Sequence, residues 1–122
     1  MKKSLLSLSV AVLFAVAVSA QAKFVWEQID EAPPEPGHSL KSFYTEVGDW
    51  TCIAVASTVP AMDVVSLDAF RRGKHDPMSS LTVVIDGKVR GSDPGVFKRQ
   101  CAAAIPDLPV AVVKAAHGYL DK

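Results

Sequence analysis

The pattern of hydrophobic and polar residues after residue 47 predicts a small sheet. Gly48 and Asp49 mark a turn, and Trp50 to Val59 (WTCIAVASTV) follows it with both alternating faces largely apolar. Such a stretch is typical of a central strand that is buried on two sides. Pro60 ends this strand, and Met62 to Val65 is a second, shorter run of β-prone residues.

A hairpin is predicted from Leu81 to Arg90. Its strands flank the pair Asp86 and Gly87, which suits a type I′ turn because both central residues of that turn need a positive φ. Between the second strand and this hairpin, Ser66 is placed to cap a brief helix whose last turn carries Arg72.

Two helices are predicted after the hairpin. The first begins at Ser92-Asp93-Pro94, a polar cap followed by proline, and has an apolar stripe that includes Phe97 and Cys101. Pro106 ends it, and Leu108 to Leu120 forms the second helix. The predicted fold class is therefore α+β: a small antiparallel or mixed sheet with an Asp-Gly hairpin, covered by two C-terminal helices and tied by one disulfide.

The first residues have the pattern of a cleavable signal peptide. Lys2 and Lys3 precede an apolar run from Leu5 to Val18, and Ala20-Gln21-Ala22 has the small-x-small pattern of a cleavage site. The alternative, a retained membrane anchor, needs about 20 strongly apolar residues, and this run is shorter and rich in alanine and serine. We expect residues 1–22 to be removed and the protein to be periplasmic or secreted. No cysteine lies near the cleavage site to carry a lipid.

The composition divides the remaining chain into an arm and a domain. Residues 23–40 are acidic and contain EAPPEPG at 31–37, and three prolines in seven residues favour an extended segment. We expect this arm to add little to stability, and residues 41–122 to form one small α+β domain. Without residues 1–22 the chain has eleven basic and thirteen acidic residues. A net charge of −2 without a basic cluster argues against nucleic-acid binding.

Cys52 and Cys101 are the only cysteines. In an oxidising compartment they have one possible intramolecular pairing, and we expect a structural disulfide. On the chain-entropy model a loop of this length stabilises the fold by about 4 kcal/mol. The alternatives are an intermolecular disulfide and a redox or catalytic thiol. A redox pair normally has the spacing C-x-x-C, which this chain lacks.

Sequence motifs for catalysis are missing. There is no G-x-S-x-G elbow, S-x-x-K pair, P-loop or dinucleotide-binding glycine motif, and His38, His75 and His117 are not spaced as metal ligands. We therefore predict no catalytic residue, no metal and no cofactor. In so short a chain this counts against an enzyme, although distant residues can assemble a catalytic site.

A basic loop is the candidate binding site. Arg71, Arg72, Lys74 and His75 lie within five positions, and together they can hold a carboxylate or phosphate group by charge-assisted hydrogen bonds. The alternative is that these residues are a solvated connection.

The order of elements from Asp63 to Ile105 resembles the C-terminal half of a thioredoxin-like domain. In that family a cis proline precedes the penultimate strand, and Pro77 occupies a comparable place. The family's C-x-x-C is absent, because Cys52 is followed by Ile-Ala-Val. The resemblance therefore implies no catalytic residue here.

These observations favour a periplasmic or secreted, non-catalytic binding or accessory protein. Candidates are an inhibitor, an immunity-type factor or a small component of an envelope or secretion assembly. Its partner would be another envelope or secreted protein, with no nucleic acid and no stable membrane insertion after cleavage. The alternatives are a degenerate thioredoxin-like redox protein or small hydrolase, and a structural subunit that donates its N-terminal arm to a neighbour's sheet edge.

Overall fold

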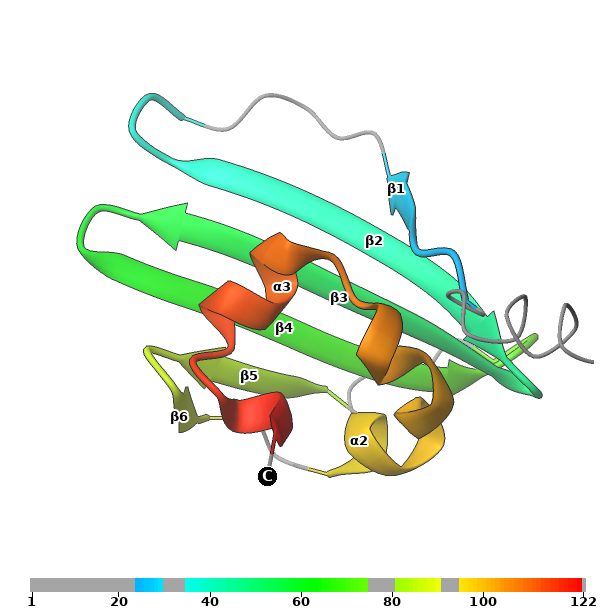
Figure 1. Cartoon of the computed structure of the whole chain (residues 1–122). Coiled ribbons are helices and arrows are strands. Elements are labelled where there is room, and N and C mark those ends of the chain that lie inside the picture. The colour runs from blue at the N-terminus through cyan, green and yellow to red at the C-terminus, as the bar shows by residue number, and fades with distance from the viewer. Residues whose placement is uncertain (1–23, 30–34, 75–80, 91–94, 122) are drawn as a thin grey trace, which may run out of the picture.

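In the described part of the chain, six strands form one antiparallel sheet in which the order in space equals the order in the sequence (Figure 1). The structure, a computed structural model, describes residues 24–29, 35–74, 81–90 and 95–121. The strands are β1 (Glu27–Ile29), β2 (Ser39–Val47), β3 (Trp50–Val59), β4 (Met62–Arg71), β5 (Thr82–Ile85) and β6 (Lys88–Val89). The α+β fold class is confirmed. The predicted signal peptide, residues 1–22, lies outside the described residues.

The three long strands β2, β3 and β4 form the body of the sheet. β3 has the predicted bounds, and Gly48, with φ of 58°, lies in the turn before it. The turn after β3 contains Pro60 and Ala61, and Ala61 has φ of 63°. β2 was not anticipated, because polar residues interrupt the alternation of apolar residues along it.

β4 is a single strand as far as Arg71, so the predicted short helix beginning at Ser66 is wrong. Val65, Leu67 and Ala69 are buried and the residues between them are half-buried, a period of two that belongs to a strand. Pairing with the whole length of β3 therefore prevails over the local capping signal. Without this helix the order of elements no longer matches that of a thioredoxin-like domain. Pro77 lies outside the described residues.

The β5–β6 hairpin confirms the predicted Asp-Gly turn. Asp86 has φ of 46° and Gly87 has φ of 84°, the two positive values that a type I′ turn requires. The turn is also joined to the start of β4, since the Asp86 amide donates to the Asp63 carbonyl at 2.9 Å.

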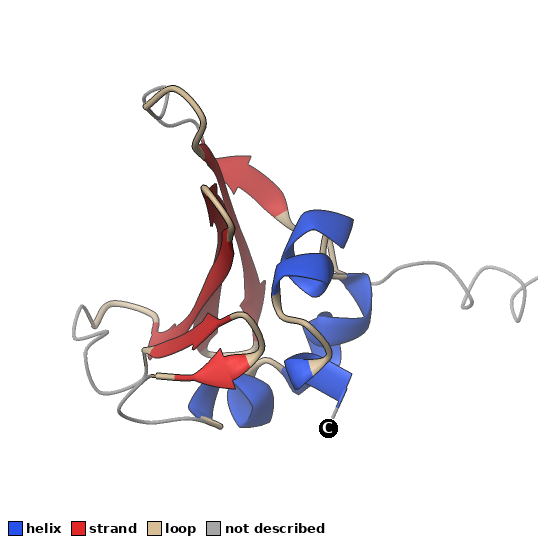
Figure 2. Cartoon of the chain, turned by 90° about the vertical axis from the view of Figure 1, so that its left-hand side faces the viewer, coloured by secondary structure: helices blue, strands red, loops and turns tan. Residues whose placement is uncertain are grey.

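The helices cover one face of the sheet (Figure 2). They are α2 (Val96–Gln100), α3 (Val110–Ala115) and the 3-10 helices η2 (Ala102–Asp107) and η3 (Tyr119–Asp121). They are shorter than predicted. α3 begins at Val110, directly after Pro109, and ends at Ala115. α2 ends at Gln100, well before Pro106, which was the predicted end. The predicted cap at 92–94 lies outside the described residues. None of the described helices has the length and hydropathy to cross a membrane.

The core lies between the sheet and this helical layer. It is built from inward-facing residues of β3, β4 and β5 and from the buried sides of α2, η2 and α3. The disulfide runs through it: Cys52 of β3 and Cys101, which follows α2, are fully buried, with an S–S distance of 2.01 Å and a Cα–Cα distance of 6.2 Å. The predicted intramolecular disulfide is confirmed.

The N-terminal segment contributes to the core, which corrects the expectation that residues 23–40 add little to stability. Trp26 is 8% exposed, and its indole Nε1–H donates to the Ala104 carbonyl at 3.0 Å. Its ring lies 6.3 Å from that of Phe97. β1 then pairs with residues 42–44 of β2. Residues 30–34 of the arm lie outside the described residues, and those at 35–37 are exposed.

We expect Gly87→Ala to destabilise the protein more than Gly48→Ala. Both positions have positive φ, and placing alanine there costs about 1–2 kcal/mol. A Cβ at Gly87 would also lie 3.1 Å from Cβ of His117, whereas a Cβ at Gly48 meets nothing within 4 Å. Urea denaturation of both variants measures the difference. Equal losses would show that the His117 backbone moves away at no cost.

Candidate functional site: a pocket between the sheet and helix α3

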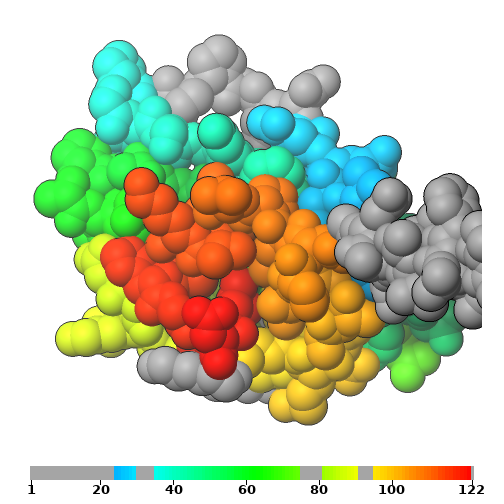
Figure 3. Space-filling view, viewed as in Figure 1, coloured from blue at the N-terminus to red at the C-terminus, as the bar shows by residue number. Residues whose placement is uncertain are grey.

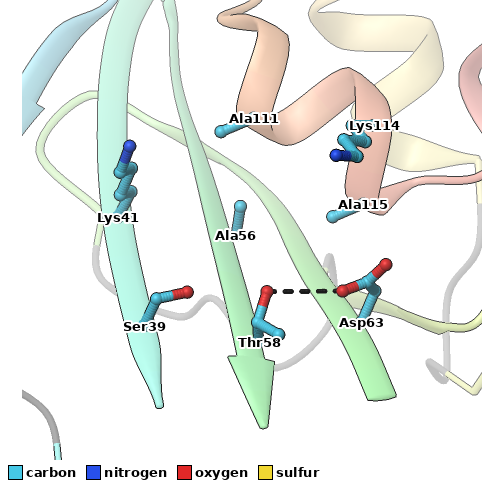
Figure 4. Close-up of a pocket in the computed structure, with 8 residues that line it drawn as sticks. All are labelled: Ser39, Lys41, Ala56, Thr58, Asp63, Ala111, Lys114 and Ala115. Atoms are coloured by element: carbon cyan, nitrogen blue, oxygen red, sulfur yellow. Dashed lines mark hydrogen bonds between the residues drawn. The ribbon is translucent and has the colours of Figure 1, made fainter. Parts of the chain in front are cut away.

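A pocket of about 320 Å³ lies between α3 and the ends of β2, β3 and β4 (Figure 4). Its lining comes from three strands and one helix. The lining residues are Ser39, Lys41, Ala56, Thr58, Asp63, Ala111, Lys114 and Ala115. In the space-filling view the strand ends, in cyan and green, extend past the orange and red helical layer on this side of the molecule (Figure 3).

Small side chains keep the pocket open. Ala56 of β3 faces the helical layer at the point where α3 presents Ala111 and Ala115. A methyl group on each of these positions leaves space between the sheet and the helix that larger side chains would fill. Further along β3 the layers are in contact, since Ala54 and Cys52 are fully buried. The pocket is thus the place where the helical layer ends before the strands do.

Two lysines reach the pocket from different elements. Lys41 extends from β2, and Lys114 directs its ammonium group from α3 toward the space above β3 (Figure 4). Neither ammonium is within salt-bridge distance of a carboxylate in the part of the chain that the structure describes. Both side chains are exposed. The pocket therefore offers two cationic donors, and neither is paired with the Asp63 carboxylate that also lines it.

Asp63 holds the polar end of the pocket together. Its Oδ1 accepts a hydrogen bond from the Thr58 hydroxyl at 3.3 Å, and its Oδ2 lies 3.1 Å from Nε2 of His117. Its backbone amide donates to Oδ1 of Asp86 at 3.0 Å. His117 is partly exposed, and through this pair it joins the end of the helical layer to β4.

The order of these groups does not suit nucleophilic catalysis. In a hydrolytic triad the base contacts the nucleophile, and the carboxylate lies behind the base. Here the carboxylate of Asp63 lies between the Thr58 hydroxyl and the His117 ring. The histidine therefore has no contact through which to remove the hydroxyl proton, and the arrangement is suited to hold a wall of the pocket.

The basic loop predicted from the sequence lies elsewhere, and its arginines have partners. Nη2 of Arg72 lies 2.8 Å from Oε1 of Glu46. The guanidinium of Arg71 lies 5.3 Å from the centre of the Trp50 ring. Lys74 is exposed in the turn after β4, and His75 lies outside the described residues. The structure does not join this loop to the pocket, and anion binding by the loop stays a prediction.

A second, shallower pocket of about 480 Å³ lies at the other end of β2. It is lined by Phe24, Val25, Glu27, Tyr44, Thr45 and Glu46. A hydrogen bond to Glu27 and the negative charge of that carboxylate raise the pKa of the Tyr44 phenol, with smaller contributions from burial and from Glu46. The phenol is thus a hydrogen-bond donor to the Glu27 carboxylate.

Sequence reasoning missed Lys41 and Lys114. For Lys41 a signal was available, because it shares its strand face with Phe43 and Thr45, which are both buried. A lysine on the inward face of a strand indicates that the core ends there. Lys114 had no comparable signal, because only the fold brings it to Lys41.

Comparison with known proteins and metal sites gives no further assignment. Among the described residues no three histidine, cysteine or acidic side chains are grouped as metal ligands. Searches against protein-family models, curated proteins and solved structures find no match to this chain.

Proposed function

We propose that this protein is an exported, non-catalytic binding protein and that the pocket beside α3 binds an anionic group of its ligand. The observation that carries the proposal is the pair of lysines, Lys41 and Lys114, in one small-walled pocket without a salt-bridge partner among the described residues. Ammonium groups held near one cavity attract a carboxylate or phosphate.

Export is supported by the first residues and by the disulfide. Residues 1–22 have the charged start, apolar run and small-x-small ending of a signal peptide. The Cys52–Cys101 disulfide is of a kind that persists in the periplasm or outside the cell and is rare in a reducing cytosol. We therefore place the ligand in the periplasm or outside the cell.

The contents of the core and of the pocket favour binding over catalysis. The two cysteines form a disulfide and are fully buried. Thiol–disulfide exchange needs an accessible thiolate, so this burial argues against the redox alternative. The Thr58 hydroxyl contacts a carboxylate rather than a base, which argues against a small hydrolase. β1 pairs with β2 of its own chain, which argues against donation of this segment to a neighbour.

We expect the purified protein to bind inorganic phosphate and acetate weakly, and each lysine to contribute. A hydrogen bond to a charged group is worth about 1.5–3 kcal/mol when its partner is lost, so Lys41→Met or Lys114→Met should weaken binding about tenfold. Nuclear magnetic resonance titration measures this, because amides near the pocket shift as anion is added.

Lys74→Met is the matched control. It removes the same charge from the basic loop that the sequence suggested, and Lys74 is exposed and outside the pocket. Under the proposal it leaves binding unchanged. If Lys74→Met weakens binding and the two pocket variants do not, the loop is the site and the pocket proposal fails.

A further inference from the structure

We infer that the anionic group recognised by the pocket is the C-terminal carboxylate of a polypeptide that ends in a small apolar residue. This inference rests on the proposed function and specifies its ligand. Three features carry it: the mixed donors and acceptors of the lining, the methyl walls, and an apolar surface next to Lys114.

The lining supplies acceptors as well as cations. The Asp63 carboxylate has about four lone-pair sites, and Thr58 and His117 occupy two of them. A dianionic phosphate would place its charge near this carboxylate and be repelled by it. A chain terminus instead has one negative charge, which suits the lysines, and a neighbouring amide N–H, which can donate to Asp63 or to a hydroxyl of the lining.

The methyl walls suit a short side chain. Ala56, Ala111 and Ala115 form the apolar part of the lining. A volume of about 320 Å³ is at the lower end of the range for ligand sites, about 300–1,000 Å³. The pocket therefore has room for a small terminal residue such as alanine or valine, and the rest of a longer ligand would lie outside it.

An exposed apolar surface lies where the rest of the ligand would pass. Val110 and Val113 are 80% and 43% exposed, and helical spacing places them on one face with Lys114. Lys114 thus separates the pocket from these valines. A free amino acid would leave the valine pair in water, whereas the residues preceding a chain terminus would cover it. This is the reason for choosing a polypeptide over a free amino acid.

The test is a titration of the purified protein with four probes. They are an acetylated pentapeptide of valine and alanine ending in a free carboxylate, the same peptide as its C-terminal amide, N-acetylalanine, and inorganic phosphate. We expect the peptide acid to bind at least about tenfold tighter than each of the other three, the factor that one lost charge-assisted hydrogen bond gives.

Two variants locate the contacts. The double substitution Val110→Ser and Val113→Ser should weaken binding of the peptide acid severalfold and leave N-acetylalanine unchanged. Val25→Ser, which is equally conservative and 75% exposed at the other end of β2, is the control and should change neither. Thermal melts of each variant confirm that it is folded before the titration.

Each other outcome has a distinct meaning. Equal binding of the peptide acid and its amide, or tighter binding of phosphate, overturns the inference. If phosphate binding then depends on Lys41 and Lys114, the anion pocket itself stands. If N-acetylalanine binds as tightly as the peptide acid, the ligand is a free amino acid derivative and the choice of a polypeptide is wrong. If no anion binds, both the inference and the proposed function fail.

Discussion

Replacing Trp26 with alanine should lower the free energy of unfolding by about 3–5 kcal/mol, the usual cost of removing a large aromatic side chain from a core. The indole packs beside Phe97 and donates to the carbonyl of Ala104. Its removal leaves a cavity and an unpaired buried carbonyl. Most small domains have a total stability of about 5–15 kcal/mol, so the variant should melt far below the wild type. Chemical denaturation followed by circular dichroism gives the value.

Two further substitutions separate the contributions. Trp26→Phe keeps most of the packing and loses the hydrogen bond, and should cost about 1–3 kcal/mol for the unsatisfied carbonyl plus a smaller packing loss. Val25→Ala changes the preceding, exposed residue and should have an effect within about 0.5 kcal/mol. A loss for Trp26→Ala no larger than that for Val25→Ala would contradict the place of Trp26 in the core.

Removal of the disulfide should have an effect of similar size. The Cys52–Cys101 bridge closes a loop with a sequence separation of 49, and on the chain-entropy model this stabilises the fold by about 4 kcal/mol. The double variant Cys52→Ala and Cys101→Ala should therefore show a much lower denaturation midpoint. The cysteines are fully buried, so the two alanines also leave a small cavity that adds to the loss.

The reduced wild-type protein is the matched control for this variant. It keeps both side chains and lacks only the S–S bond, so its loss isolates the covalent contribution. Neither cysteine is among the residues that line the pocket, so each form that remains folded should still bind the anion. Identical midpoints for oxidised and reduced protein would contradict a stabilising role for the bridge.

The predictable part of the fold is the part fixed by local chemistry. β3 lies between two turns and is apolar on both faces, and the Asp86-Gly87 turn needs only its own residues to adopt positive φ. The end of β4 was mistaken for a helix, because a capping serine is a local signal and pairing with β3 is not. β2 was not predicted, because polar residues interrupt the alternation of apolar residues along it and the helical segment that it contacts, η2, lies far along the chain.

The candidate site was less accessible to sequence analysis than the fold. The predicted basic loop is a cluster in sequence, whereas the pocket is a cluster in space: its two lysines are separated by most of the domain. Its shape depends on alanines, residues that give no signal of a cavity by themselves. Ala56, Ala111 and Ala115 line a pocket only because of the way α3 lies against the sheet.

The order of the strands has a consequence for how the protein folds. Each strand pairs with its neighbour in sequence, so the hairpins of the central sheet close short loops and can form early. The burial of Trp26 depends instead on a distant part of the chain, because the carbonyl that accepts its hydrogen bond is 78 residues away. β2, β3 and β4 can therefore pair before the segment around residue 104 has folded, and the indole of Trp26 stays exposed to solvent until η2 has formed. The first buried residue of the described chain is therefore among the last to reach its place.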